Sequence, residues 1–207
     1  MRHALTTQGY GIRLRPVRLD DAPFIVWLRN LDYVKGRVGD SAADVTVQER
    51  WLNSYFEREG DYYFIVETLN ETPLGTEGIY NLNGNSAEIG RNIIRPGVPA
   101  AIPTLILLVD LIYGQMGMTQ VRATAVADSR NVHSLFRKAG FRQVGVEHAG
   151  LVIGGEAIDM VHFVQNAEDW WRVRERGNAP ARRAELMIGS WEQNYLQSCA
   201  QGLATET

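Results

Sequence analysis

The chain has 207 residues, 45% of them hydrophobic and 22% charged, which is the composition of a globular protein with one substantial core. Its net charge of −3 gives no overall attraction to nucleic acid or to an anionic membrane, so we expect neither as a partner. The single cysteine, Cys199, excludes an internal disulfide and a cysteine-based metal site and favours a cytoplasmic location.

The first half of the chain predicts a strand, two helices and three further strands. Residues 12–18 (IRLRPVR) alternate apolar and charged side chains, as a half-buried strand does. Residues 22–30 predict an amphipathic helix, and Thr46 with Glu49 forms a capping box for a second one. The turns that follow favour antiparallel pairing. The three strands are expected at residues 62–68, 74–82 and 87–94.

The second half alternates helices with strands. Residues 100–115 predict a buried helix, whose most apolar run is too short to span a bilayer. A strand at 121–126 and a helix at 132–138 then imply a parallel crossover. Two strands, at 143–153 and 157–164, flank a Gly-Gly pair and predict a final hairpin.

The segment DSRNVHSLFRKAGF (128–141) follows the predicted strand at 121–126. Gly140 suits the left-handed position that closes a helix, and Phe141 would hold the turn against the core. A strand, a polar loop with Asp and Asn and a helix ending in Lys-Ala-Gly-Phe resembles the second half of the acyl-CoA-binding core of GNAT N-acetyltransferases.

The order of elements extends this resemblance over residues 11–170. The segments IRLRPVRLDDAPFIVWLRN, DYYFIVE and IDMVHFVQNAEDW look like the branch that holds ribosomal-protein N-terminal and nucleotide-sugar N-acetyltransferases. The resemblance implies an α+β (mixed α/β) fold, with a central, mostly antiparallel sheet flanked by helices. We expect this domain at 1–166.

A C-terminal helical extension with a disordered tail is expected at 167–207. Its helix places Ala184, Met187, Trp191 and Tyr195 on one face. This stripe has two interpretations: it packs on its own domain, or it forms a homodimer surface.

The resemblance also implies acetyl-CoA as co-substrate, with no metal. Backbone N–H groups of the turn RPGVPAA (95–101) would hold the pyrophosphate at the start of a helix. Pro99 replaces the second glycine of the family pattern and supplies no N–H. Arg95 would add a charged contact. The expected amide donors are Gly97, Val98, Ala100 and Ala101.

Other expected contacts of acetyl-CoA also come from the resemblance. Ile93 and Ile94 would pair with the pantetheine, and Asn131 would contact one of its amides. Phe136, also expected beside the cofactor, stands where the family commonly has the tyrosine that protonates the leaving thiolate. His133, Ser134, Tyr80 or a water are the alternatives for that role.

A carboxylate must accept the proton of the attacking amine. Strand alternation favours Glu88, and Glu77 on the preceding strand is the second candidate. The acceptor is expected to enter between the N-terminal helices and the final hairpin. Its expected contacts are Trp27, Arg29, Asn30 and Tyr33, with Lys35 and Arg37 nearby.

The resemblance therefore implies an N-acetyltransferase that acts on a primary amine, for which an amino-sugar nucleotide is the first candidate. The alternatives are a protein N-terminal acetyltransferase acting on a peptide N-terminus, and a non-catalytic module that senses acyl-CoA or binds a partner. Pro99 and Phe136 are the residues that favour the last alternative.

Overall fold

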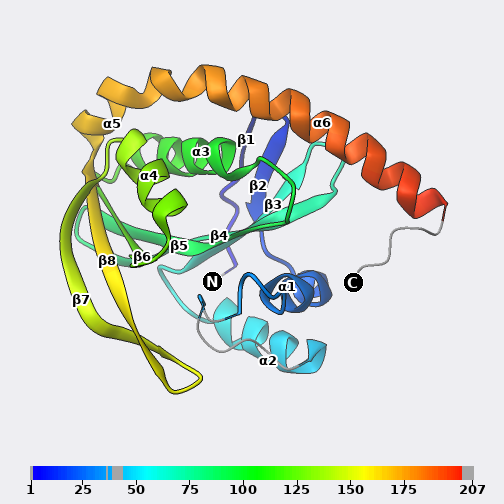
Figure 1. Ribbon diagram of the computed structural model, residues 1–207, viewed down its shortest axis with the longest axis horizontal. Helices are drawn as coiled ribbons and strands as arrows, with labels where there is room; N and C mark the ends of the chain where they lie inside the picture. The colour runs from blue at the N-terminus through cyan, green and yellow to red at the C-terminus, as the bar shows by residue number, and fades with distance from the viewer. Residues whose placement is uncertain (1, 36, 39–43, 202–207) are drawn as a thin grey trace.

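The computed structural model describes residues 2–35, 37–38 and 44–201, and an eight-stranded mixed sheet forms its centre (Figure 1). The strand order is β1-β2-β3-β4-β5-β6-β8-β7, and only β5 and β6 pair in parallel. The strands are β1 (Thr7–Gly9), β2 (Ile12–Pro16), β3 (Tyr62–Thr68), β4 (Pro73–Asn83), β5 (Ser86–Ile94), β6 (Gln120–Val126), β7 (Arg142–Ile153) and β8 (Glu156–Asn166). The α+β fold is thus confirmed.

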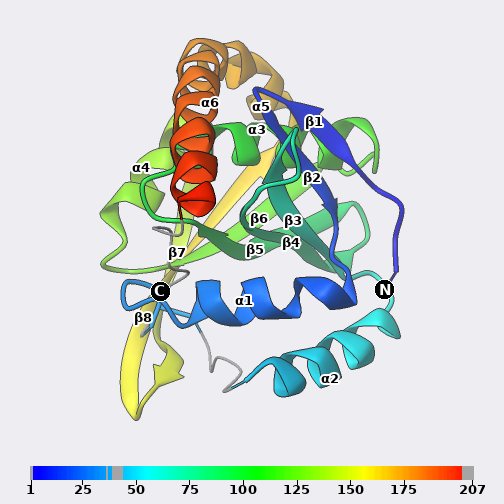
Figure 2. The same cartoon turned by 90° about the vertical axis from the view of Figure 1, so that its right-hand side faces the viewer.

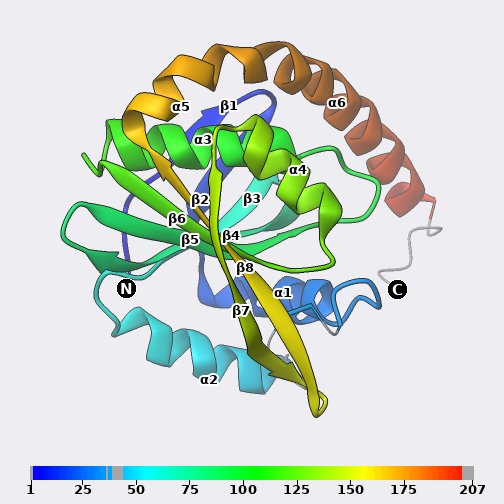
Figure 3. The same cartoon turned by 60° about the vertical axis from the view of Figure 1, so that its left-hand side comes forward.

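Helices cover both faces of the sheet. The face with α3 (Ala101–Gly114) and α4 (Arg130–Lys138) lies opposite the face with α1 (Ala22–Arg29) and α2 (Val45–Phe56), as Figures 2 and 3 show. The largest core cluster joins α3 to the sheet, and two smaller clusters join α1 and α2 to it. None of the helices in the described part of the chain is long and apolar enough to cross a membrane.

The N-terminal half differs from the sequence-based predictions in two ways. The helix α2 is capped by Asp44, whose carboxylate accepts a hydrogen bond from the Val47 N–H at 2.9 Å, so the proposed cap at Thr46 lies inside the helix. The short strand β1 was missed because its hairpin with β2 depends on two left-handed residues, Tyr10 and Gly11, rather than on a strand-like pattern. Part of the expected loop at 32–47 lies outside the described residues.

The C-terminal extension packs on its own domain. It consists of α5 (Ala167–Val173), a short 3-10 turn and α6 (Asn178–Ala200), which runs past α3 in Figure 1. The carboxylate of Asp110 on α3 accepts from Trp170 Nε1 at 2.9 Å and pairs with Arg174 at 2.7 Å. Of the expected stripe, Ala184 is buried but Met187 is 51% exposed, so Met187 does not face the core. A homodimer through α6 stays a prediction. The expectation of a disordered tail is not tested, because residues 202–207 lie outside the described residues.

Candidate functional site

The main feature of the sheet is a point where two parallel strands separate. β5 and β6 pair only from Ser86 with Gln120 to Ile89 with Ala123. Beyond this pair, β5 continues along β4 to Ile94, while β6 continues along β8 to Val126. The two strands, both wholly described, leave a wedge between them. Since neither strand covers the other there, backbone groups along the wedge are open to an extended ligand.

A bulge in β5 shapes this wedge. Between two register pairs, Thr76 with Ile93 and Gly78 with Gly90, β5 carries one extra residue, and Arg91 has a φ of 59°. Glu77 lies opposite the bulge and is 2% exposed. Its carboxyl accepts from Asn92 Nδ2 at 2.5 Å and from the Gly78 N–H at 3.1 Å.

The side chain of Glu77 faces the α3 side of the sheet, because its register partner Phe64 belongs to the core beneath α3. Burial raises the pKa of this carboxyl to about 8, although both hydrogen bonds act in the opposite direction. Glu77 therefore holds the bulge, and its carboxyl is not on the face that α1 and α2 cover.

Glu88 lies on the opposite face from Glu77. Its neighbours Ala87 and Ile89 point into the core beneath α3, so alternation along β5 turns Glu88 to the side of α1 and α2. Its carboxylate accepts a hydrogen bond from Asn81 Nδ2 at 3.0 Å. Glu88 comes one residue before the last β5–β6 pair, directly beside the origin of the wedge.

Tyr80 pairs with Glu88 across β4 and β5, and its side chain therefore shares the same face. Its hydroxyl lies over Gly90, the first β5 residue in the wedge: a Cβ on Gly90 would overlap this oxygen and lie 3.0 Å from Cζ. Burial raises the pKa of Tyr80 to about 12, with a further contribution from the charge of Glu88. The hydroxyl is therefore a proton donor at neutral pH.

The other side of the wedge carries a second polar group. Thr124, the first β6 residue beyond the last β5–β6 pair, has its Oγ1 3.3 Å from His162 Nδ1. His162 Nε2 lies 3.1 Å from a carboxylate oxygen of Glu147 on β7. Sequence reasoning missed these residues because β8 pairs with β6, its neighbour in the sheet but not in the chain.

The turn between β5 and α3 lies at the far end of the wedge. Gly97 has a φ of 77°, and the Val98 N–H bonds back to the Arg95 carbonyl at 3.3 Å. The Val98 amide is thus already used within the turn. Pro103 occupies the third position of α3 and removes another donor, in addition to Pro99. The amides that fit a phosphate are those of Gly97, Ala100, Ala101 and Ile102, the last of which was not anticipated.

Arg95 does not extend into this turn. It is 8% exposed, and its guanidinium carbon lies 4.6 Å from the ring centroid of Trp27, 5.6 Å from that of Trp191 and 4.5 Å from that of Tyr195. We call these three rings the Arg95 cage. Among the described residues no carboxylate pairs with Arg95, so cation–π contacts stabilise its charge. The expected contact of Arg95 with phosphate stays a prediction.

Residues 31–35 and 37–38, which follow α1, contact both arms of the wedge. The Tyr33 hydroxyl donates to the Ile94 carbonyl at 2.5 Å, and Arg37 Nη1 lies 3.2 Å from an oxygen of Asp128, just beyond β6. The Ile94 carbonyl, which was expected to pair with pantetheine, therefore already accepts a hydrogen bond from Tyr33. Ile93 turns its side chain into the core formed with α1.

The remaining substrate candidates lie at the end of α1. Trp27 belongs to the Arg95 cage, while Arg29 ends the helix and Asn30 follows it. The Asn30 side chain donates to the Val26 carbonyl at 2.8 Å. Trp27 and Tyr33 border the wedge.

The start of α4 lies beside the end of β6. Asn131 is exposed in its first turn, where it is accessible to a ligand. His133 is 7% exposed, and its Nε2 lies 3.0 Å from the Val126 carbonyl oxygen. The Phe136 ring packs between Phe141 and Phe163, at centroid distances of 5.0 and 5.3 Å. Neither His133 nor Phe136 therefore presents a proton donor to the wedge.

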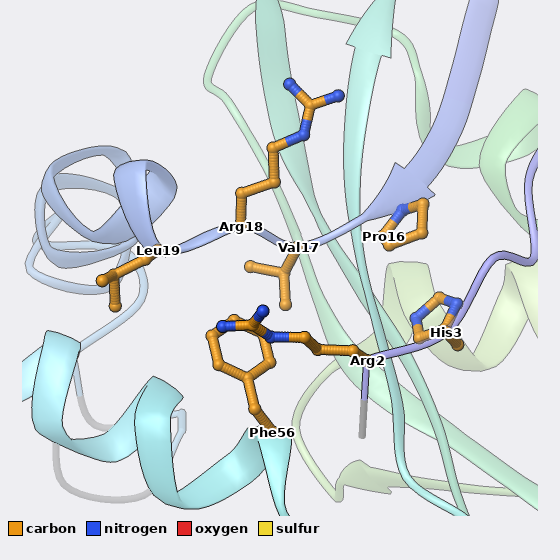
Figure 4. Close-up of a pocket in the computed structure, with 7 residues that line it drawn as sticks. All are labelled: Arg2, His3, Pro16, Val17, Arg18, Leu19 and Phe56. Atoms are coloured by element: carbon orange, nitrogen blue, oxygen red, sulfur yellow. The ribbon is translucent and has the colours of Figure 1, made fainter.

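A separate cavity of about 450 Å³ lies at the other end of the sheet, between the N-terminal segment, the end of β2 and α2. Figure 4 shows that its cationic groups do not converge: Arg2 lies over the ring of Phe56, at 4.9 Å, while Arg18 points away from it. We assign no chemistry to this cavity. No cluster of His, Cys, Asp or Glu suited to a metal ion occurs in the described ranges.

Comparisons with known proteins agree with this geometry. A family model described as an Acetyltransferase (GNAT) domain matches residues 12–142. A search of curated proteins found no match. Among solved structures, a nucleotide-linked sugar GNAT, FdhC, is 23% identical with a TM-score of 0.70, covering 87% of this chain and 98% of its own.

Two other solved structures share the fold. A GCN5-related N-acetyltransferase from Brucella melitensis is 16% identical with a TM-score of 0.74, and the match covers 86% of each chain. The spermidine N-acetyltransferase SpeG from Vibrio cholerae, in a mutant form, is 18% identical with a TM-score of 0.69, covering 79% of this chain and 98% of its own.

Proposed function

Because the chain belongs to the GNAT acetyltransferase family, we propose that it transfers an acetyl group from acetyl-CoA to a primary amine at the wedge between β5 and β6. One observation carries this proposal. The same wedge has two arms that do not pair with each other, amide donors at the start of α3 and a carboxylate with a tyrosine at its origin.

The two ends of the wedge fit the two ends of acetyl-CoA. The amides of Gly97, Ala100, Ala101 and Ile102 and the positive end of the α3 dipole suit a pyrophosphate. The amides of a pantetheine arm fit the β5 backbone of residues 90–93, which does not pair with β6. In this position the thioester lies near the last β5–β6 pair, where Tyr80, Glu88 and Thr124 surround it.

Glu88 is the proposed general base. An ammonium group is not nucleophilic, so the amine must lose a proton before its nitrogen attacks the thioester carbonyl. Glu88 lies on the face from which an acceptor between α1, α2 and the β7–β8 hairpin would approach (Figure 3). Glu77 lies on the other face, and we propose that it maintains the bulge.

We propose an amino-sugar nucleotide as the acceptor class. FdhC, described as a nucleotide-linked sugar GNAT, supports this class, as do the basic residues Lys35 and Arg37 beside the wedge. An acetyl-CoA-dependent enzyme with one exposed cysteine, Cys199, fits a cytoplasmic location.

An amine panel tests the proposal. The purified chain would be incubated with acetyl-CoA and UDP-amino sugars, polyamines or peptides with free N-termini, and products would be detected by mass spectrometry. Acetylation of the amino sugars alone supports the proposed class, whereas acetylated peptides would identify an N-terminal acetyltransferase. Binding of acetyl-CoA with no product from any amine would favour the non-catalytic module.

The variant E88Q tests the base. It should lower kcat by about 10²-fold or more, since general base catalysis contributes about 10²–10⁴-fold, while acetyl-CoA affinity stays within about twofold. The exposed Glu59 offers a matched control, because E59Q makes the same change at a side chain outside the sheet. Unchanged turnover in E88Q would exclude Glu88 as the base.

A further inference from the structure

We propose that Tyr80 protonates the thiolate that leaves as CoA, and that Glu88 then reprotonates Tyr80. This inference rests on the proposed acetyl transfer at the wedge. It identifies the residue that supplies a proton to the leaving group, which neither Phe136 nor His133 can do in this structure.

The position of the Tyr80 hydroxyl carries the inference. It lies over Gly90, the first residue of β5 beyond its last pair with β6, on the face that Glu88 also occupies. Only a glycine leaves room for this oxygen, because any Cβ at residue 90 would overlap it. In the described part of the chain no hydrogen bond engages the hydroxyl. It is therefore free to donate to a group at the origin of the wedge.

The surrounding contacts fix the ring without using the hydroxyl. The Arg91 guanidinium lies 4.7 Å from the centroid of the Tyr80 ring and is held by Asp61, with the shorter of its two hydrogen bonds at 2.5 Å. The bulge at Arg91 brings this cation beneath Tyr80. The titratable and charged groups around the phenol are thus Glu88, Arg91 with Asp61, Glu77 on the same strand, and Arg122 opposite Glu88 on β6.

The proton that the leaving sulfur takes up can be followed through Tyr80 and Glu88. The ammonium group gives one proton to the Glu88 carboxylate, its nitrogen then forms a bond to the thioester carbon, and a second proton of that nitrogen is released to solvent as the amide forms. The carbon–sulfur bond breaks, sulfur leaves with the electron pair, and it takes the proton of the Tyr80 hydroxyl. Glu88 returns its proton to the Tyr80 oxygen, on the adjacent strand. Both residues regain their starting forms, and the products are the acetylated amine and free CoA.

The variant Y80F removes only the hydroxyl, since the ring over Gly90 and Arg91 is kept. We expect kcat to fall about 10²-fold, with the KM for acetyl-CoA within about twofold. Y62F is the matched control, because Tyr62 on β3 lies on the core side and should leave kcat unchanged. Circular dichroism and acetyl-CoA binding would show that Y80F is folded.

Fluorinated tyrosines at position 80 separate proton donation from packing. They keep the ring and the hydroxyl but lower the pKa of the phenol, so a new loss of kcat should appear at alkaline pH and move down as fluorines are added. Native Tyr80, with a pKa raised to about 12, should show no such loss below about pH 10. The loss of kcat appears on the alkaline side because a deprotonated phenol has no proton to give to the thiolate.

Two results would overturn the assignment: turnover of Y80F within about threefold of the native chain, or a pH profile that fluorination does not move. An inactive native chain with every amine would instead overturn the proposed function, so the two failures are distinguishable.

Discussion

Replacing Glu77 with glutamine should change how the stability of this fold depends on pH. The carboxyl is buried opposite the β5 bulge, and burial raises its pKa from 4.5 to about 8. A raised carboxyl pKa means that the folded state binds a proton more tightly than the unfolded state does. The native chain therefore loses stability as the pH rises from about 4.5 to 8, a loss that E77Q should not show.

The magnitude follows from the pKa difference. A shift from 4.5 to about 8 corresponds to roughly 4–5 kcal/mol when complete, because each pKa unit is worth about 1.4 kcal/mol. Between about pH 5 and pH 9 most of this change occurs. The free energy of unfolding of the native chain should thus fall by about 4 kcal/mol more than that of E77Q over this range.

Urea unfolding followed by circular dichroism at several pH values measures this difference. E59Q is the control, because Glu59 is exposed and its variant should follow the native curve. A constant offset between the native chain and E77Q is expected from altered hydrogen bonds with Asn92 and Gly78, so the comparison uses slopes. Parallel curves from pH 5 to pH 9 would refute the raised pKa of Glu77.

Three further outcomes are expected. W191A opens the Arg95 cage and should cost about 2 kcal/mol in urea unfolding, whereas L186A, at a side chain 75% exposed, should stay within about 0.5 kcal/mol. G90A should cost about 1–3 kcal/mol through overlap with Tyr80, and G189A, with open space around it, should stabilise α6 by about 0.5–1 kcal/mol. Light scattering tests the homodimer: substituting the exposed Met187 by Lys should halve the mass of a dimer, and an unchanged mass argues against an α6 interface there.

Local patterns predicted most of the fold. Strands β3, β4, β5 and β6 have boundaries within a residue of those expected, because turn residues and alternating side chains mark them. The parallel pairing of β5 with β6 followed from the helix between them. Gly140 has a φ of 89° and Phe141 is 3% exposed, so the end of α4 is confirmed in detail.

The site was less predictable because it depends on register and burial. Glu77 and Glu88 lie on opposite faces because Glu88 pairs with Tyr80, three residues from Glu77 along β4, and this register cannot be read from either strand alone. The sequence predicted that Arg95 contacts phosphate. It did not show that three aromatic rings from α1 and α6 surround the guanidinium of this residue. Those rings come from distant parts of the chain, and no local pattern connects them.

A calorimetric titration of acetyl-CoA into the native chain tests the central claim most directly. The wedge between β5 and β6, with its amides at the start of α3, predicts a single saturable site per chain and a rise in the unfolding temperature. Absence of heat and of any thermal shift at millimolar acetyl-CoA would contradict the account.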